Sequence, residues 1–295
     1  MTPIGEGELT ADIDARAVWR WIEPIHAVTY FAPECRAAAK AAGLPSFWMG
    51  YFGGRAAPLG PVGPTVVEAL FFNFHPGMVA RSIPDAWSFV EPPELLRVRR
   101  MAAAEALRAR IPSLDSLAAT VGPVLDQVVG GANGSGRALF SANRRLGRSG
   151  DPVEALWQAC TSLREHRGDG HVATLTASGL DGCQALVLFA AGEGLDPEVL
   201  RQNRGWSADE WTLAGERLAG RGLVADGGLT SAGQALRRAI EEGTDRLAAQ
   251  PYRVLDEDRT RLLADELGPA VAALLASGVI PFPNPIGLPA PEEPG

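Results

Sequence analysis

Residues 181–247 constrain the fold more strongly than any other stretch, because few architectures share their order of helix and strand signals. The pattern predicts three short helices, two short strands and a long helix from Ser231. Ser207 can cap one helix, and Glu210 follows it at the spacing of a capping box. Asp226-Gly227 is a strong signal for a hairpin turn. This order predicts a winged helix-turn-helix.

The same stretch carries a motif. Residues 218–236 read Leu-x-x-x-Gly-Leu-Val and then, after a short gap, Gly-Leu-Thr-x-x-Gly-x-x-Leu. This block resembles the recognition helix, wing and following helix of MarR-like regulators. Three other stretches, residues 48–60, 163–171 and 281–289, resemble an actinobacterial family of largely uncharacterised helix-turn-helix proteins. That resemblance implies the fold and carries no established catalytic residues.

Composition and charge narrow the functional classes. The chain of 295 residues is 46% hydrophobic, which is typical of a globular protein with an ample core. It has one lysine, Lys40, and a net charge of −8. DNA-binding proteins usually present a basic face to the phosphates, so DNA is a possible partner that the acidic balance disfavours.

The cysteines and the apolar runs indicate the cellular compartment that we expect for the protein. Cys35, Cys160 and Cys183 have no spacing of a metal site or disulfide framework, so we expect small buried side chains in a reduced compartment. No apolar run approaches the roughly 18 residues that a membrane helix needs, and no signal-peptide pattern opens the chain. We therefore expect a cytoplasmic protein without a membrane partner. The sequence does not identify a cofactor.

The two halves of the chain resemble each other. A shift of 136 residues aligns Trp21 with Trp157 and Pro61 with Pro197, without a gap over about 40 positions. We interpret the chain as mainly helical, with tandem winged helix-turn-helix units that form a pseudo-dimer. Chance similarity between helix-rich sequences is the alternative.

The predicted domain boundaries follow from this duplication. A diverged winged-helix-like unit would span residues 1–130, and a MarR-like unit would span residues 139–279. A glycine-rich linker at 131–138 would join them. The proline-rich tail at 280–295 is apolar, so we expect it to lie pinned against a surface. Such a chain would be a monomeric pseudo-dimer or a homodimer.

The two predicted recognition helices differ. The helix at 65–74 in the first unit is so apolar that we expect it to be buried. The acidic residues in the first turn of the second unit's helix have the wrong sign for phosphates and base acceptors. This helix offers Asp209, Glu210, Thr212, Glu216 and Arg217. The scaffold therefore resembles that of a DNA-binding protein in which groove recognition is reduced or lost.

The strongest polar cluster surrounds a turn predicted at Gly168 and Gly170. The candidate catalytic side chains that this turn would bring together are Glu165, His166, Asp169 and His171. A histidine oriented by a carboxylate could transfer protons in an enzyme. A metal site is less favoured, because the histidines lack a metal-binding spacing. The structural alternative is that Asp169 caps a helix while its neighbours form ion pairs.

A second group combines aromatic rings with polar side chains that a core seldom contains without partners. A mostly apolar cavity with a few converging polar groups is typical of a small-molecule site. The resemblance to MarR-like proteins implies cavities near Arg55 in the first unit and near His166 in the second. The predicted ligand-binding residues are His26, Tyr30, Trp48, Tyr51, Phe52, Arg55, Phe72, Asn73, His75 and Arg167.

The sequence thus favours a winged-helix scaffold that binds a small, partly apolar organic ligand, as a ligand-responsive regulator or a sequestering protein. Two alternatives stay open. One is an enzyme on the same scaffold that uses His166 and His171 as acid and base, and the other is a DNA-binding regulator. The first hypothesis requires a void near Arg55 or His166.

Overall fold

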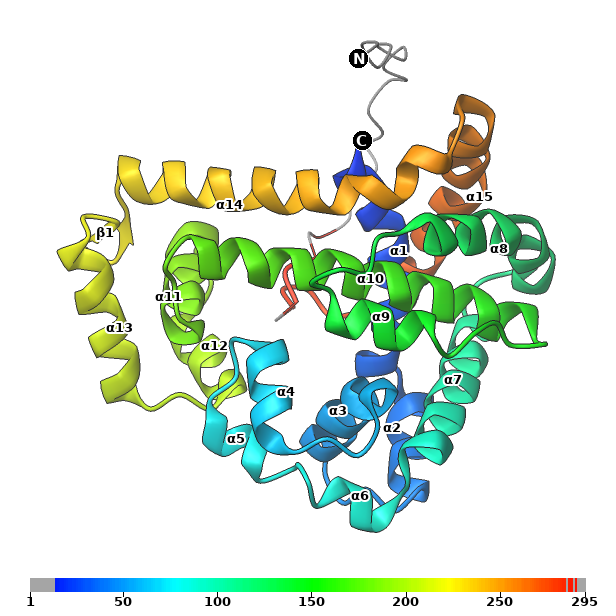
Figure 1. Cartoon of the computed structure of the whole chain (residues 1–295), viewed down its shortest axis with the longest axis horizontal. Coiled ribbons are helices and arrows are strands. Elements are labelled where there is room, and N and C mark those ends of the chain that lie inside the picture. The colour runs from blue at the N-terminus through cyan, green and yellow to red at the C-terminus, as the bar shows by residue number, and fades with distance from the viewer. Residues whose placement is uncertain (1–13, 285, 289, 291–295) are drawn as a thin grey trace, which may run out of the picture.

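The structure is a computed structural model that describes residues 14–284, 286–288 and 290, and it is mainly helical (Figure 1). The described elements of the first half are α1 (Ala15–Phe31), α2 (Pro33–Ala41), α3 (Phe47–Ala56), η1 (Ala57–Leu59), α4 (Pro64–Phe71), α5 (Pro76–Ala80), α6 (Ala86–Phe89), α7 (Pro92–Arg108) and α8 (Leu114–Gly131). Those of the second half are α9 (Ala138–Arg144), α10 (Pro152–Ala177), α11 (Gly182–Glu193), α12 (Pro197–Arg204), α13 (Ala208–Gly220), β1 (Val224–Ala225), β2 (Gly228–Leu229), α14 (Ser231–Ala249), η2 (Gln250–Val254) and α15 (Glu257–Ala276).

The elements predicted for residues 181–247 are present in the predicted order, from α11 through the β1–β2 hairpin to α14. The Ser207 hydroxyl accepts a hydrogen bond from the Glu210 amide at 3.2 Å, and the Glu210 carboxylate accepts one from the Ser207 amide at 2.9 Å. This capping box starts α13. Asp226 (φ 50°) and Gly227 (φ 76°) form the hairpin turn, which needs positive φ at both positions.

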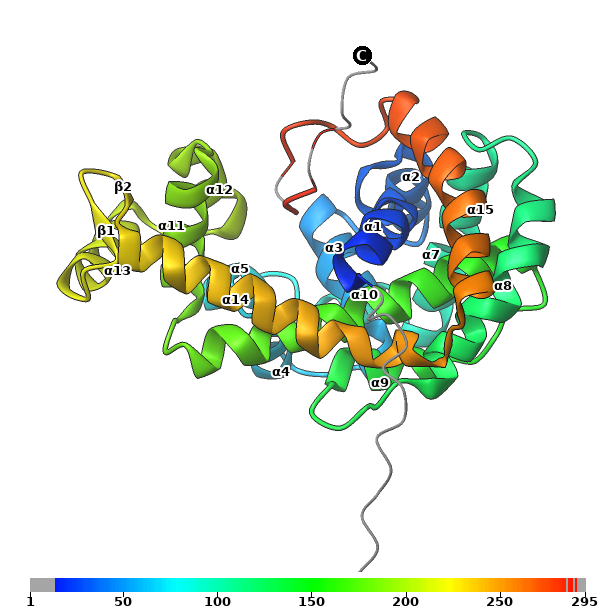
Figure 2. The ribbon, with the colours of Figure 1, turned by 90° about the horizontal axis from the view of Figure 1, so that it is seen from above.

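α10 is the central helix of the molecule. It contacts α1, α7, α8, α9 and α14, and Figures 1 and 2 show that α10 and α14 both run toward α11 and the β1–β2 hairpin. Its residues Leu156, Trp157 and Cys160 are fully buried in the largest core cluster, together with Ile22 and Ile25 of α1. Because one apolar core includes helices from both halves, the halves are stabilised together.

The packing of the two halves is reciprocal. α8 of the first half packs on α10 of the second, and α15 of the second half packs on α1 of the first. The start of the predicted linker is bonded to η2, where Gln250 donates to the Gly131 carbonyl at 2.9 Å and accepts from the Asn133 amide at 2.8 Å. Among the described residues of the first half, no strand hairpin corresponds to β1–β2.

The turn predicted at Gly168 and Gly170 is wrong, because α10 continues through both glycines to Ala177. Gly170 instead permits a close approach of Arg137, since a Cβ at this position would lie 2.8 Å from a guanidinium nitrogen of that residue. The glycines therefore reflect crowding around a continuous helix rather than a change of chain direction.

The helix predicted at 65–74 is shorter and less buried than expected. α4 ends at Phe71, and although Val67 and Phe71 are buried, Val66 and Ala69 on the other face are not. Single apolar side chains are common on protein surfaces, so an apolar composition did not require complete burial here.

The proline-rich tail lies against the protein, as predicted, for the part that the structure describes. Ile280 and Leu288 are buried in a cluster with Tyr30, and Asn284 exchanges two hydrogen bonds of 3.0 Å with Leu288. Positions 285, 289 and 291–295 of this tail lie outside the described residues. Within the described chain, no single helix is long and apolar enough to cross a membrane. Only α10 and α11 taken together have the required length and composition, and this pair is bent by 99°.

Candidate functional site

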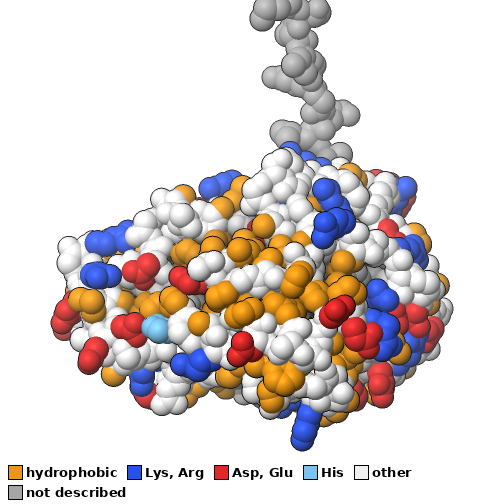
Figure 3. Space-filling view, turned by 60° about the horizontal axis from the view of Figure 1, so that its bottom comes forward, with side chains coloured by type: hydrophobic (Ala, Val, Ile, Leu, Met, Phe, Trp, Pro, Cys, Tyr) orange, Lys and Arg blue, Asp and Glu red, His pale blue; other side chains and the backbone are white. Residues whose placement is uncertain are grey.

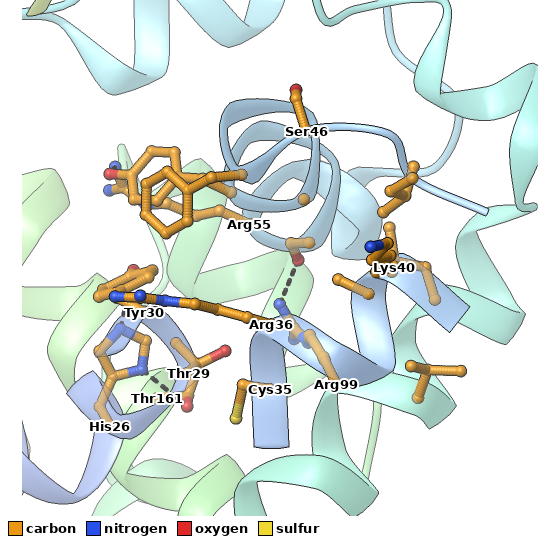
Figure 4. A pocket seen from close by; sticks show the side chains of 18 of the residues that line it. His26, Thr29, Tyr30, Cys35, Arg36, Lys40, Ser46, Arg55, Arg99 and Thr161 are labelled. Atoms are coloured by element: carbon orange, nitrogen blue, oxygen red, sulfur yellow. Dashed lines mark hydrogen bonds between the residues drawn. The ribbon is translucent and has the colours of Figure 1, made fainter. Parts of the chain in front are cut away.

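A cavity of about 240 Å³ lies between α1, α2, α3, α7 and α10 (Figure 4). Four of the predicted ligand-binding residues line it, namely His26, Tyr30, Tyr51 and Arg55, and so does Glu165. Their binding of a ligand stays a prediction. The same space is also lined by Arg36, Lys40, Phe47, Gly54, Arg99, Trp157 and Thr161.

Aromatic rings form the apolar wall of the cavity. The rings of Tyr30 and Tyr51 lie 5.1 Å apart between centroids, and Phe47 and Trp157 also face the space. Trp48 and Phe52 do not line it, although the sequence predicted that they would. They lie on the opposite side of α3, where their rings pack with those of the neighbouring aromatic core.

His26 lies at the base of the cavity and already has partners for both ring nitrogens. Its Nδ1 lies 3.0 Å from the Thr161 hydroxyl, and its Nε2 lies 2.9 Å from the Tyr30 hydroxyl. Burial, reinforced by the positive charge of Arg164, holds the pKa of His26 well below its usual value. The ring is therefore neutral, and it orients the Tyr30 hydroxyl at neutral pH.

A buried ion pair forms one side of the cavity. Arg55 on α3 donates to both carboxylate oxygens of Glu165 on α10, at 2.8 and 3.0 Å, and Arg164 donates to the same carboxylate at 2.9 Å. Burial raises the pKa of Glu165, but the charges of Arg55 and Arg164 outweigh it and hold the pKa well below its usual value. Glu165 is thus a charged anchor for Arg55 rather than a group that exchanges protons at neutral pH.

Arg99 of α7 also borders the cavity. Its guanidinium donates to the Asn143 side-chain oxygen at 3.0 Å and to the Gly54 carbonyl, and it lies over the Trp157 ring at 5.3 Å. Its Nε is buried and has no hydrogen-bond partner among the described residues. Burial lowers the pKa of Arg99 to about 10, so the group remains a cation at neutral pH.

Phe72, Asn73 and His75 lie outside the cavity, against the prediction, because the chain turns away at Phe72 (φ 57°) after α4 ends. The Asn73 carbonyl accepts a hydrogen bond from the Trp206 indole at 3.0 Å. The His75 ring lies 3.1 Å from the Glu210 carboxylate, at the start of α13. This docking segment, residues 72–78, therefore attaches the first half to the turn of the helix-turn-helix.

The four acid/base candidates do not converge on one point, because α10 is continuous: His166 and Asp169 both contact Phe140, whereas Glu165 faces Arg55. His166 packs edge-on against the Phe140 ring at 4.9 Å, and burial with the charge of Arg137 lowers its pKa to about 3. Asp169 accepts from the Phe140 amide at 2.9 Å, and burial raises its pKa to about 6. His171 lies on another face, 2.9 Å from the Thr244 hydroxyl.

Near the second predicted site, at His166 and Arg167, the structure has a hollow with a different lining. A hollow of about 460 Å³ does border Asp169 and Arg137, but neither His166 nor Arg167 lines it. Arg167 instead forms an ion pair of 2.6 Å with Asp245. Within the described residues, no group of three or more His, Cys, Asp or Glu side chains could hold a metal ion.

The exposed face of α13 is short of positive charge. Asp209, Leu213 and Glu216 are exposed on it, and Arg217 is its basic residue. The face of the molecule seen in Figure 3 carries acidic and basic side chains side by side, around a band of hydrophobic ones. Neither surface resembles the continuous basic area that phosphate contacts require.

Several cavity residues were not predicted from the sequence. Arg36 and Lys40 are exposed residues of α2, Arg99 is a partly buried residue of α7, and Trp157 and Thr161 lie on α10 without a distinguishing motif. The signal that could have indicated Arg99 is its place one helical turn after Leu95, on the buried side of α7.

A sequence model of a helix-turn-helix family matches residues 15–281. The match includes both the cavity and the helices and hairpin of residues 181–247. No curated protein and no solved structure matches the chain.

Proposed function

The chain belongs to a helix-turn-helix family, and from this premise we propose that it is a regulator-like scaffold that binds a small, partly apolar organic molecule. The observation that carries the proposal is the cavity of about 240 Å³ with its aromatic wall and its few converging polar groups. Small-molecule sites typically have this composition.

The tandem arrangement is part of the proposal. The 136-residue shift aligns α11 with α3, and α10 with α1 and α2 together. The reciprocal packing of α8 on α10 and of α15 on α1 is what a two-fold pseudo-symmetric duplication would produce. The first unit would then have lost its wing and kept its ligand cavity.

DNA binding would be weak or absent in this protein. A dimer of winged units reads two half-sites about 34 Å apart, which requires both recognition helices to reach the major groove. Here the docking segment contacts Trp206 and Glu210 directly, and the start of α13 is acidic. These contacts favour a closed arrangement over one that spans two grooves.

Ligand binding and the winged unit are linked through the first half. α3 supplies Tyr51 and Arg55 to the cavity, and its ring neighbours include Phe71 and Phe74, which flank the start of the docking segment. A ligand that favours one packing of these rings would change the position of the segment on α12 and α13. This would make the protein ligand-responsive.

The proposal is tested by filling the cavity. Gly54 lines it, and a Cβ placed on this glycine would meet no atom within 4 Å. Gly54→Leu should therefore abolish the stabilisation that small aromatic molecules give in a thermal-unfolding screen. Gly130→Leu, at an exposed glycine of α8 with open space, is the matched control and should respond like the original protein. If the same small aromatic molecules stabilise both variants equally against thermal unfolding, the binding site does not lie in this cavity.

DNA is tested separately. A mobility-shift titration with random-sequence and genomic fragments at low salt should give no salt-sensitive complex. A tight complex whose affinity falls steeply with salt would instead support the DNA-binding regulator.

A further inference from the structure

We propose that the hollow of about 460 Å³ between α4, α9 and α10 binds a small primary amine, whose ammonium group pairs with the Asp169 carboxylate. This hollow shares no lining residue with the cavity at Arg55, so it is a second site with a ligand of its own. Three features support the proposal: Asp169 is buried at the hollow, one of its oxygens has no partner among the described residues, and the rest of the wall is largely apolar.

The hollow lies where the two halves of the chain meet. Leu70 comes from α4 of the first half, Ala138 comes from α9, and Asp169, Val172 and Ala173 come from α10. Figure 1 shows these three helices next to one another near the middle of the molecule. Ala138 and Ala173 are exposed at the rim, whereas Asp169 is only 8% exposed. The carboxylate therefore lies at the inner end of a space that is open to solvent.

Asp169 has one oxygen that the protein does not use. Its Oδ2 accepts a hydrogen bond of 2.9 Å from the Phe140 amide, in the first turn of α9. Its Oδ1 accepts none from the described residues, and the carboxylate forms no ion pair with any of them. Oδ1 is also not sealed from solvent, unlike the Nε of Arg99. Since both oxygens of a carboxylate accept hydrogen bonds, Oδ1 is available to a ligand in the hollow.

Support of α9 does not by itself explain a carboxylate at this position. The side-chain oxygen of an asparagine would also accept the bond from the Phe140 amide. Burial raises the pKa of Asp169 to about 6, so the ionised form that is present at pH 7.5 lowers the stability of the protein. A charged group that lowers stability and faces an open space is typical of a functional site.

The other polar groups of the hollow favour a ligand that donates hydrogen bonds. Ser141 gives its hydroxyl hydrogen to the Gly134 carbonyl at 3.0 Å, which leaves its oxygen as an acceptor. Arg137 also borders the hollow, but its terminal nitrogens donate to the His166 and Leu247 carbonyls, which hold the guanidinium between α10 and α14. An ammonium group carries three N–H donors and a positive charge, and it therefore complements the free carboxylate oxygen.

The apolar part of the wall determines the rest of the ligand. Leu70, Val172 and Ala173 supply hydrocarbon side chains from two helices, and a short alkyl chain would gain affinity from contact with them. The volume lies within the range of small-molecule sites, which is about 300–1,000 Å³. Because the rim is open, part of the ligand stays in water. We therefore expect a weak complex that selects the charge of the ligand rather than one carbon skeleton.

The test compares a cationic probe with a neutral one of the same shape by nuclear magnetic resonance titration at pH 7.5. The probes are n-hexylamine, which carries a positive charge at this pH, and 1-hexanol. We expect the amine to bind about 10-fold more tightly, the lower end of what a hydrogen bond to a charged group usually gives. The amide signals of residues 134–141 and 169–173 should shift most.

Asp169→Asn keeps an acceptor for the Phe140 amide and removes the charge, so it should abolish the preference for the amine and leave the affinity for 1-hexanol unchanged. The matched control is Asp258→Asn, which removes the same charge at an exposed residue of α15 and should leave both affinities unchanged. Thermal unfolding verifies that each variant folds. If Asp169→Asn does not fold, Ala173→Arg replaces it, because it places a cation at the exposed rim and should weaken amine binding alone. An unchanged amine affinity in Ala173→Arg would overturn the proposal.

The remaining outcomes separate this site from the cavity at Arg55. Gly54→Leu, which fills that cavity, should leave amine binding unchanged, and a loss of amine binding in this variant would place the amine in the cavity and overturn the site at Asp169. Equal affinities of the amine and the alcohol would overturn the preference for a cation, and so would a preference that persists in Asp169→Asn. The absence of binding by both probes would overturn the site at Asp169 without bearing on the cavity at Arg55.

Discussion

Positions 30 and 166, which the 136-residue shift aligns, have opposite surroundings. Tyr30 lines the cavity, whereas His166 is packed against Phe140. The difference begins at Pro33, where α1 ends and α2 starts in a new direction, because proline is favoured at the first turn of a helix and disfavoured inside one. The aligned residue of the second half is Asp169, through which α10 continues.

This contrast shows why the cavity forms in the first half. α2 supplies Cys35, Arg36, Ala39 and Lys40 to the cavity lining, and it can do so because it departs from the line of α1. In the second half the aligned residues lie on the unbroken α10, and the hollow there is lined by Asp169, Val172 and Ala173 rather than by an aromatic wall. The interruption of the helix, more than the composition of its rings, accounts for the aromatic-walled cavity of the first half.

The largest effect on the free energy of unfolding is expected at Glu165, through which α10 holds Arg55 of the first half. Glu165→Gln would leave the Arg55 guanidinium buried without its charged partner, so we expect the free energy of unfolding to fall by about 3–5 kcal/mol in urea denaturation at pH 7. Because the folded-state pKa of Glu165 is depressed, this stabilisation is present above the unfolded pKa and is lost only as the pH falls through the folded pKa.

The control for this prediction is Glu198→Gln. Glu198 pairs with Arg201 on the surface of α12, and we expect no measurable change from its loss. Equal effects of the two substitutions would mean that the Arg55–Glu165 pair does not support the cavity wall.

A smaller effect is expected where the two halves meet. Gly182 begins α11, and a Cβ there would collide with the Phe72 carbonyl oxygen of the docking segment. Gly182→Ala should therefore displace the segment and destabilise the protein by about 1–3 kcal/mol, as overpacking usually does. Hydrogen exchange should become faster for the amides of residues 72–78.

Gly215→Ala is the matched control on α13. No atom lies within 4 Å of a Cβ built at this glycine, so alanine should stabilise the helix by up to about 1 kcal/mol. Unchanged exchange at residues 72–78 in Gly182→Ala would show that the segment does not depend on this close approach.

The sequence predicted the order of helices and strands in residues 181–247 well because their signals are local. The capping box at Ser207 and the turn at Asp226 determine element boundaries through neighbouring residues. It did not predict the continuity of α10, because Gly170 owes its place to a distant contact with Arg137. The sequence grouped Tyr30 with Arg55 around a predicted void. It did not indicate that Arg99 also lines this cavity, because that position depends on the packing of α7 against α3.

The smallest effect on the free energy of unfolding is expected at Asp169, which lies one turn after Glu165 on α10. Burial raises the pKa of Asp169 to about 6, above the ordinary value of about 3.9, so the folded state binds more protons between these values. Its contribution to stability therefore decreases as the pH rises through this window, opposite to the direction for Glu165.

Asp169→Asn should stabilise the protein by about 1–2 kcal/mol at pH 7.5 and flatten the pH dependence of the free energy of unfolding between pH 4 and 6. Asp258→Asn, at an exposed residue of α15, should leave that dependence unchanged. A loss of stability in Asp169→Asn at pH 7.5 would mean that its charge strengthens the bond from the Phe140 amide more than burial penalises it.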